Sequence, residues 1–201
     1  MESTLKEMED YAKKNKICIV QPPTRDFLQE LCAKLKPKRI LEVGTAIGYS
    51  ASCMLLACDA KITCAEASVP NIKLANNNFS KLGLAERVKI VEGDCIKTLP
   101  SLVGQKFDLI FLDGPKGLYS EIFELLLPLL DENGVFVADN VEFRKMVSLG
   151  AEISEPRFEK TVKALRTFID KVIKNDKLDV EVFPTLGDGI LVAKFKKEKQ
   201  K

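Results

Sequence analysis

The chain has 201 residues, of which 46% are hydrophobic and 30% are charged, and its formal net charge is +2 at pH 7. This length and composition favour one globular domain with a sizeable core. The small net charge does not by itself indicate a nucleic-acid partner, and no apolar run approaches the roughly 20 residues that cross a membrane.

Histidine is absent from the sequence. The commonest general base and zinc ligand is therefore missing, so acid–base or metal chemistry falls to Asp, Glu, Asn, Lys, Cys or Tyr. The oxygen ligands among these favour a hard cation such as Mg²⁺. The six cysteines form no CxxC pair, so free thiols in a reducing cytosol are the simplest interpretation. Residues 1–16 alternate acidic and basic side chains without an apolar core, so we expect a cytoplasmic protein without a secretory signal.

Two amphipathic helices are predicted first, at 2–14 and 24–35, separated by a Pro-Pro break. From Lys38 onward, short apolar runs rich in β-formers alternate with longer stretches of helical spacing. The predicted strands are 39–43, 61–65, 88–91, 107–112 and 135–138. The predicted helices between them are 48–57, 70–82, 95–102 and 119–130. This alternation predicts an α/β fold with a parallel sheet covered by helices on both faces.

After the fifth strand, a polar loop containing Gly150 and Pro156 leads to a predicted helix at 158–175. Two strands at 179–183 and 190–195 then form a terminal hairpin around 187–189. We find no internal repeat and no low-complexity linker. We therefore expect a single domain over 1–201, with N-terminal helices in 1–36, an α/β core in 37–196 and a charged tail in 197–201.

The first strand continues into the sequence EVGTAIGYS at 42–50, which a helix follows. Gly44 and Gly48 let the backbone turn tightly and approach a ligand at a helix N-terminus, although an ordinary βα turn has the same composition. Three residues separate the glycines, so the motif is not GxGxxG. This spacing argues against a nicotinamide-dependent oxidoreductase.

Acidic residues end the next two predicted strands. Glu66 follows the second strand, where an acid can accept both hydroxyls of a ribose. Gly93 and Asp94, followed by Cys95, end the third strand, where a small residue and an acid suit the edge of an adenine. Solvated charges and an N-cap aspartate are the simpler alternatives. Since ligands of open α/β sheets bind at the carboxyl ends of the strands, the three features in order predict a nucleotide-like ligand there.

Oxygen ligands follow the fourth and fifth strands. Asp113 ends the fourth strand, and Asp139 and Asn140 end the fifth. If these strands are neighbours, the carboxylates lie so close that they repel each other unless a cation or a proton lies between them. Solvated strand-end acids and a turn remain the alternative. Lys116, three residues after Asp113, is a candidate general base, although a single lysine in a lysine-rich chain is usually a surface charge.

Three segments together resemble the cation-dependent O-methyltransferase family, which includes catechol and caffeoyl-CoA enzymes and many bacterial members. They are ILEVGTAIGYS at 40–50, FDLIFLD at 107–113 with Lys116, and DNV at 139–141. The resemblance extends from about residue 19 to residue 195. The part from Phe158 to Gly189 is most similar to bacterial members, some of which methylate 5-hydroxyuridine in the tRNA anticodon.

The resemblance implies a Rossmann-like class I methyltransferase fold, with a seven-stranded, mostly parallel sheet and a C-terminal antiparallel hairpin. It implies S-adenosylmethionine (SAM) as the methyl donor, with Glu66 on its ribose. The residues implied to surround the donor are Glu42, Gly44, Ala46, Gly48, Ser50, Glu66, Gly93, Asp94, Cys95 and Asp113. It further implies that Asp113, Asp139 and Asn140 bind Mg²⁺, or another divalent cation such as Mn²⁺ or Ca²⁺, and that Lys116 is the base. Family members are commonly dimeric, so it also implies a homodimer.

The acceptor is left open by these residues. Gly114-Pro115 and Arg25 depart from the small residues common in the family, and both lie in segments that shape the substrate site. A small molecule with two neighbouring oxygens, as in a catechol, is the first hypothesis. A tRNA 5-hydroxyuridine is the alternative, for which basic residues between 13 and 39 could form an RNA-binding face. A nicotinamide-dependent oxidoreductase and a binding protein without catalysis are more remote alternatives, and Asp188 has no assigned role.

Overall fold

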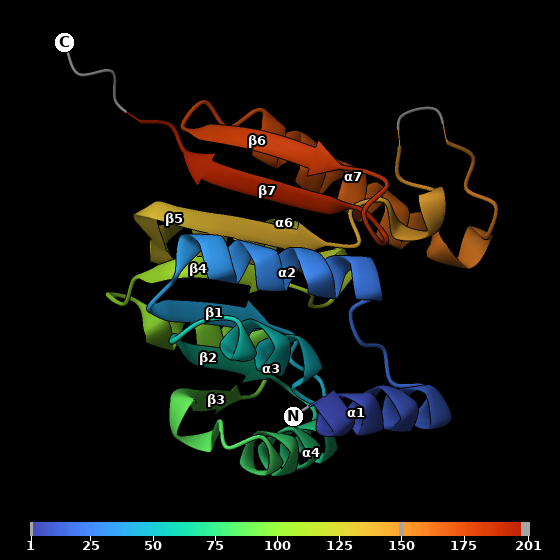
Figure 1. Cartoon of the computed structure of the whole chain (residues 1–201). Helices are drawn as coiled ribbons and strands as arrows, with labels where there is room; N and C mark the ends of the chain where they lie inside the picture. Colours follow the sequence, from blue (N-terminus) through green and yellow to red (C-terminus); the bar gives the residue numbers. More distant parts are fainter. Residues whose placement is uncertain (1, 149–150, 198–201) are drawn as a thin grey trace.

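The computed structural model describes residues 2–148 and 151–197, and its centre is a seven-stranded sheet (Figure 1). The strand order is β3-β2-β1-β4-β5-β7-β6. The strands are β1 (Arg39–Val43), β2 (Lys61–Glu66), β3 (Val88–Glu92), β4 (Phe107–Leu112), β5 (Leu130–Asp139), β6 (Leu178–Phe183) and β7 (Ile190–Phe195). The first five strands pair in parallel, and β7 runs antiparallel to both β5 and β6. The predicted mostly parallel sheet with a terminal hairpin is therefore confirmed.

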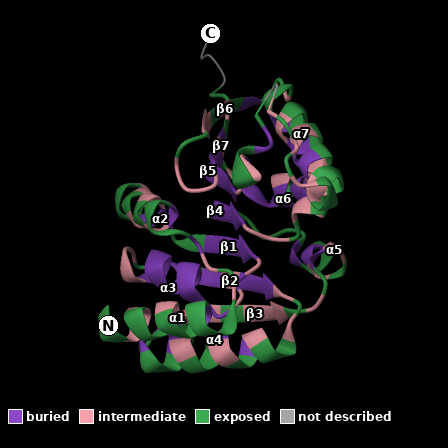
Figure 2. Cartoon of the chain, turned by 90° about the vertical axis from the view of Figure 1, so that its right-hand side faces the viewer, coloured by how far each residue is buried: buried purple, intermediate pink, exposed green. Residues whose placement is uncertain are grey.

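Helices cover both faces of the sheet, as predicted, and Figure 2 shows buried residues on the strands between them. The α-helices are α1 (Glu2–Asn15), α2 (Pro22–Leu35), α3 (Tyr49–Leu56), α4 (Val69–Lys81), α5 (Cys95–Thr98), α6 (Tyr119–Leu126) and α7 (Glu159–Ile173). One core cluster packs α5, α6 and α7 on the sheet, and the other packs α1 to α4 on the opposite face. β1 is buried at four of its five positions because the two core clusters pack against its two faces.

Prolines account for the predicted boundaries that were wrong. The Pro-Pro pair does not separate two helices but forms the first turn of α2, where the missing N–H groups have no intrahelical acceptor. The helix predicted at 95–102 is α5 followed by a 3₁₀ turn, Leu99–Leu102, which contains Pro100. The helix predicted at 119–130 likewise changes to the 3₁₀ turn Leu127–Leu129 at Pro128.

The longer β5 is the other departure, since only 135–138 was predicted as strand. Leu130 already pairs with Phe107, and a register shift follows before Leu109 pairs with Val135. Gly150 and residues 198–201 of the predicted tail lie outside the described residues. Within the described ranges, no helix combines the length and apolar character needed to cross a bilayer.

The parallel register places the functional segments at one edge. Val43 is opposite Ala65 and Leu112, and Leu112 is opposite Ala138. The residues that follow these positions, Gly44, Glu66, Asp113 and Asp139, therefore lie side by side at the carboxyl ends of β1, β2, β4 and β5. Asp113 and Asp139 each come one residue after a paired position, so the condition set for their meeting, adjacent strands, is satisfied.

Candidate active site

Backbone hydrogen bonds continue the sheet by one residue beyond the strands and hold this edge together. The N–H of Gly44 donates to the carbonyl of Ala65, that of Gly93 to Glu66, and that of Asp113 to Val43, each at 2.9 Å. The residues predicted to bind the ligand are thus attached directly to the rigid core. Loops held in this way keep their side chains in place without rearrangement on binding.

Gly44 is the point at which only glycine fits. Its φ of +92° is unfavourable for other residues, and a Cβ atom there would lie 2.1 Å from the carbonyl oxygen of Asp113. The close approach of the loop after β1 to the end of β4 therefore depends on a missing side chain. It brings the first glycine of the loop next to the first predicted metal ligand.

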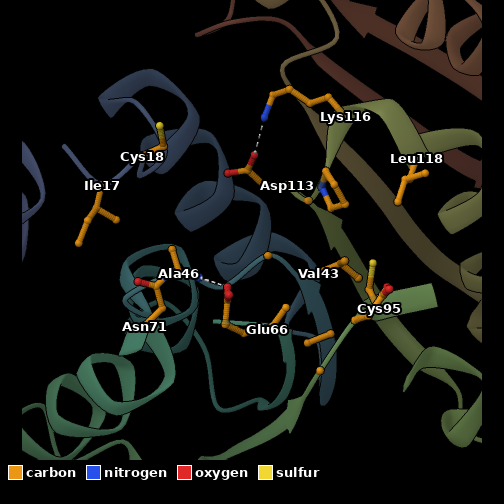
Figure 3. Close-up of a pocket in the computed structure, with 17 residues that line it drawn as sticks. Ile17, Cys18, Val43, Ala46, Glu66, Asn71, Cys95, Asp113, Lys116 and Leu118 are labelled. Carbon is orange, nitrogen blue, oxygen red and sulfur yellow. Dashed lines mark hydrogen bonds and ion pairs between the residues drawn. The ribbon is translucent and has the colours of Figure 1, made fainter. Parts of the chain in front are cut away.

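A cavity of about 700 Å³ opens over this edge (Figure 3). Most of the predicted donor-binding residues line it: Gly44, Ala46, Glu66, Gly93, Asp94, Cys95 and Asp113, and Lys116 joins them. Asn71 of α4 and the segment Ile17–Cys18 complete the wall, and neither was predicted from the sequence. A cavity of this volume, with an acid on the wall after β2, suits a nucleoside-sized ligand.

Glu66 also makes hydrogen bonds to two backbone segments inside the protein. Its carboxylate accepts the backbone N–H of Ala46 at 2.9 Å and that of Ser68 at 2.8 Å. Figure 3 shows Glu66 pointing to Ala46 across the cavity floor. The acid therefore fixes the loop after β1, while each carboxylate oxygen can still accept a further hydrogen bond.

Glu42, Gly48 and Ser50 do not line the cavity but lie behind the loop. Glu42 is fully buried, and its carboxylate accepts hydrogen bonds from Ser50 at 2.5 Å, from Thr45, and from the Cys64 thiol at 3.5 Å. Gly48, with φ +81°, is the N-cap residue that precedes α3, and a Cβ atom there would lie 2.6 Å from the Phe79 ring. Direct contact of these three residues with a donor stays a prediction. Their observed contacts shape the loop from within.

Burial raises the pKa of Glu42 to about 7, against 4.5 for an ordinary glutamate, although its hydrogen bonds oppose the shift. Between pH 4.5 and about pH 7, Glu42 loses its proton in the unfolded chain but keeps it in the folded chain. The free energy of unfolding therefore falls as pH rises through this range. We expect this loss to reach about 3 kcal/mol by pH 8. Glu42→Gln should remove that part of the pH dependence, as measured by chemical denaturation of the ligand-free protein at pH 5 and pH 8.

The exposed variant Glu132→Gln on β5 is the matched control and should keep the wild-type pH slope. Comparing slopes cancels the contributions of other buried acids, which both proteins share. Parallel stability curves for wild type and Glu42→Gln would show that Glu42 has the same proton affinity in the folded and unfolded chain, contrary to the effect of burial.

A second cavity, of about 420 Å³, adjoins the first. Asp113 and Lys116 line both, as do Ile17 and Cys18. Asp139 and Asn140 line only the second, so the structure brings the three predicted metal ligands and the predicted base to one place. The remaining lining residues are Glu9, Ala12, Lys13, Ile19, Gln21, Phe143, Arg144 and Asp188. A small ligand in this cavity would lie directly beside one in the first.

The charges at the junction are only partly compensated. Burial raises the pKa of Asp113 and of Asp139, and the charge of Asp113 raises that of Asp139 further. Lys116, with its Nζ atom 3.6 Å from Oδ1 of Asp113, lowers the pKa of Asp113. Two buried carboxylates that repel each other are stabilised by a cation between them. Carboxylate and amide oxygens are also suitable ligands for Mg²⁺, so this donor set fits a hard divalent cation.

The donor set depends on Asn140 as its third member. In the described part of the chain, no three His, Cys, Asp or Glu side chains are grouped so that they could hold a metal. The backbone of Asn140 is left-handed, with φ +61°, and its N–H donates to Oδ1 of Asp139 at 2.7 Å. This turn at the end of β5 keeps the two side chains adjacent, in a conformation that asparagine tolerates better than most residues.

Two supporting features were missed from the sequence. The buried Tyr119 hydroxyl lies 3.2 Å from the carbonyl oxygen of Asp139 and 3.4 Å from that of Leu112, so it joins the ends of β5 and β4. The hairpin tip is joined to the loop after β5, since Glu142 N–H donates to Asp188 and Val141 N–H to Gly189. This attachment explains how Asp188, which had no assigned role, reaches the second cavity. The only sequence signal was the Gly-Asp-Gly tip itself.

Comparisons with known proteins agree with this geometry. The model of the family described as "O-methyltransferase" matches residues 1–196. A catechol O-methyltransferase from Niastella koreensis is 32% identical over 183 residues, covering 87% of this chain and 80% of the relative. An SAH-bound methyltransferase structure from Podospora anserina has a TM-score of 0.88 at 28% identity, covering 96% of this chain and 88% of that one. An O-methyltransferase from Bacillus cereus in complex with SAH has a TM-score of 0.86 at 25% identity, covering 96% and 91%.

Proposed function

Since this chain belongs to the O-methyltransferase family and is a SAM-dependent O-methyltransferase, we propose that it methylates a hydroxyl with a neighbouring oxygen on a catechol-like small molecule, using a divalent cation. The observation that supports the proposal is the position of Asp113 and Lys116, which line both cavities. The family assignment agrees with the missing GxGxxG motif and sets the oxidoreductase hypothesis aside.

The first cavity is proposed to bind the donor. Glu66 accepts the ribose hydroxyls, and Gly93, Asp94 and Cys95 surround the base. When bound, SAM supplies an electrophilic methyl group on a sulfonium sulfur. Gly44 allows the donor to approach the end of β4 because no side chain separates the loop from Asp113.

The second cavity is proposed to bind the acceptor. Asp113, Asp139 and Asn140 hold the cation, preferably Mg²⁺, with Mn²⁺ and Ca²⁺ as other candidates. When bound, the cation lowers the pKa of a hydroxyl beside it. Lys116, as the neutral amine, accepts the hydroxyl proton and becomes an ammonium, which the Asp113 carboxylate, 3.6 Å away, then stabilises. The chain thereby places acceptor and donor side by side where Asp113 and Lys116 line both cavities, which reduces the entropy cost of the reaction.

The proposal is tested by incubating the purified protein with SAM and a panel of aromatic vicinal diols, in Mg²⁺ or in excess chelator, with product detection by mass spectrometry. We expect methylated diol in Mg²⁺ and none in chelator, because the buried aspartates need a counter-ion. Transfer RNA that carries 5-hydroxyuridine is included in the panel, with nucleosides analysed after digestion. Methylation of tRNA without methylation of any diol would overturn the acceptor class, and full turnover in chelator would overturn the metal.

A further inference from the structure

The N-terminal segment forms a wall of the acceptor cavity, although it lies outside the sheet. Residues between Glu9 and Gln21 line the second cavity, and Ile17 and Cys18 also line the first. Figure 3 shows Ile17 and Cys18 on the far side of the cavity from Val43 and Cys95. Any change in the position of α1 on the core therefore changes the space available to the acceptor.

One side of α1 packs on the core through apolar contacts. Met8 and Ala12 are buried in the core cluster of α2, α3 and α4, and an ion pair between Glu7 and Lys81 at 3.7 Å lies on the surface. Exposed ion pairs of this kind contribute little. Apolar contacts are not directional, so they do not by themselves fix the rotation or translation of a helix on the core.

A directional contact is present at Glu9, at the cavity end of this interface. Oε1 of Glu9 accepts the Tyr49 hydroxyl at 2.5 Å and lies 3.3 Å from Nη1 of Arg25. Tyr49 is 3% exposed, whereas the Glu9 and Arg25 side chains are 29% and 28% exposed. Nη2 of Arg25 is held in turn by Asp26 at 2.7 Å. Charge-assisted hydrogen bonds of this length are among the stronger ones in proteins.

These three side chains, which we name the Glu9 cluster, join α1, α2 and α3. Tyr49 is the first residue of α3 and directly follows Gly48, the last residue of the loop after β1 (residues 44–48), which we name the donor loop. Its neighbour Ser50 binds Glu42, which shapes that loop from behind. The cluster therefore connects the wall of the acceptor cavity to the loop that frames the donor cavity.

We infer that Glu9, Arg25 and Tyr49 are positioning residues that set the acceptor cavity by fixing α1 against the donor loop. The inference rests on the proposed function of the second cavity. Its distinctive consequence is a split in the kinetics: the acceptor KM depends on the cluster, whereas the affinity for SAM depends on it only weakly because Glu66, Gly93 and Asp94 remain in place.

Tyr49→Phe removes one hydroxyl from this buried contact and should raise the acceptor KM about tenfold, the scale of one hydrogen bond to a charged group. Glu9→Ala should do the same, and Glu9→Gln, which keeps an oxygen acceptor for Tyr49, should recover most of the loss. SAM affinity, measured by calorimetry, should change by less than about threefold, which corresponds to about 0.6 kcal/mol. Tyr11→Phe and Asp10→Asn, on exposed positions of α1, are the matched controls.

Hydrogen exchange gives a readout that does not need turnover. Amides of α1 should exchange faster in Tyr49→Phe than in Tyr11→Phe, while those of β1 and β4 stay protected. If wild type methylates no diol, the proposed function fails, and the exchange result still tests the cluster. Unchanged acceptor KM and unchanged α1 exchange in both Tyr49→Phe and Glu9→Ala would overturn the inference, as would an equal loss of SAM affinity and acceptor affinity.

Discussion

Asp139→Ala is expected to lower methyl transfer by about a thousandfold or more, the scale of several kcal/mol of metal-derived stabilisation. Asp139 lines only the second cavity, whereas Asp113 lines both. SAM binding should therefore survive the loss of Asp139 better than the loss of Asp113. The measurements are initial rates over a Mg²⁺ titration and calorimetric affinities for SAM and for Mg²⁺.

Removing the charge of Asp139 with the isosteric Asp139→Asn has a different effect on the stability of the ligand-free protein. The charge of Asp113 raises the pKa of Asp139, so each carboxylate disfavours ionisation of the other. Asp139→Asn should therefore leave the metal-free protein at least as stable as wild type at neutral pH, while Mg²⁺ no longer raises its melting temperature. Asp179→Asn, an exposed position on β6, is the control. Wild-type turnover in Asp139→Ala would remove this residue from the proposed metal site.

The position of the active site was predictable because parallel strands end at one edge. The apolar runs at 39–43 and 107–112 coincide with β1 and β4, and Gly44 and Asp113, which follow them, are placed by the strand register alone. Covered strands are read well from sequence because their apolar runs are short and nearly continuous. The sequence did not show which strand lies next to β4. The structure pairs β4 with β5, which brings Asp113 and Asp139 together.

The parts that could not be predicted depend on contacts between distant segments. Glu9 meets Tyr49 across 40 residues, and Tyr119 reaches the end of β5 across 20. The sequence spacing of neither pair indicates a contact. A glutamate on a surface helix and a tyrosine in the core have the same local sequence pattern whether or not they contact a distant residue. The contacts of Glu42 inside the protein could not be predicted for the same reason: its full burial and its hydrogen bond with Ser50 are visible only in the fold, and its contact with a donor stays a prediction.

Lys116→Met is expected to lower kcat by about a hundredfold to ten-thousandfold, the usual contribution of a positioned acid or base. Nζ of Lys116 lies 3.6 Å from Asp113, and the residue lines both cavities at the junction where the acceptor hydroxyl would meet the donor methyl. Because the proposed cation site keeps Asp113, Asp139 and Asn140, the affinities for SAM and Mg²⁺ should change far less than kcat. Steady-state kinetics and calorimetry on the same protein measure both.

A purely electrostatic role predicts a different pattern. If Lys116 only balanced the charge of Asp113, Lys116→Arg would restore activity because arginine keeps the charge. Arginine does not give up its proton in proteins, so a base role predicts that Lys116→Arg stays as impaired as Lys116→Met. Acceptors with a more acidic hydroxyl, such as 4-nitrocatechol beside catechol, should then lose less activity in both variants because they need the base less. Equal losses for the two acceptors, together with full rescue by arginine, would assign Lys116 to charge balance alone.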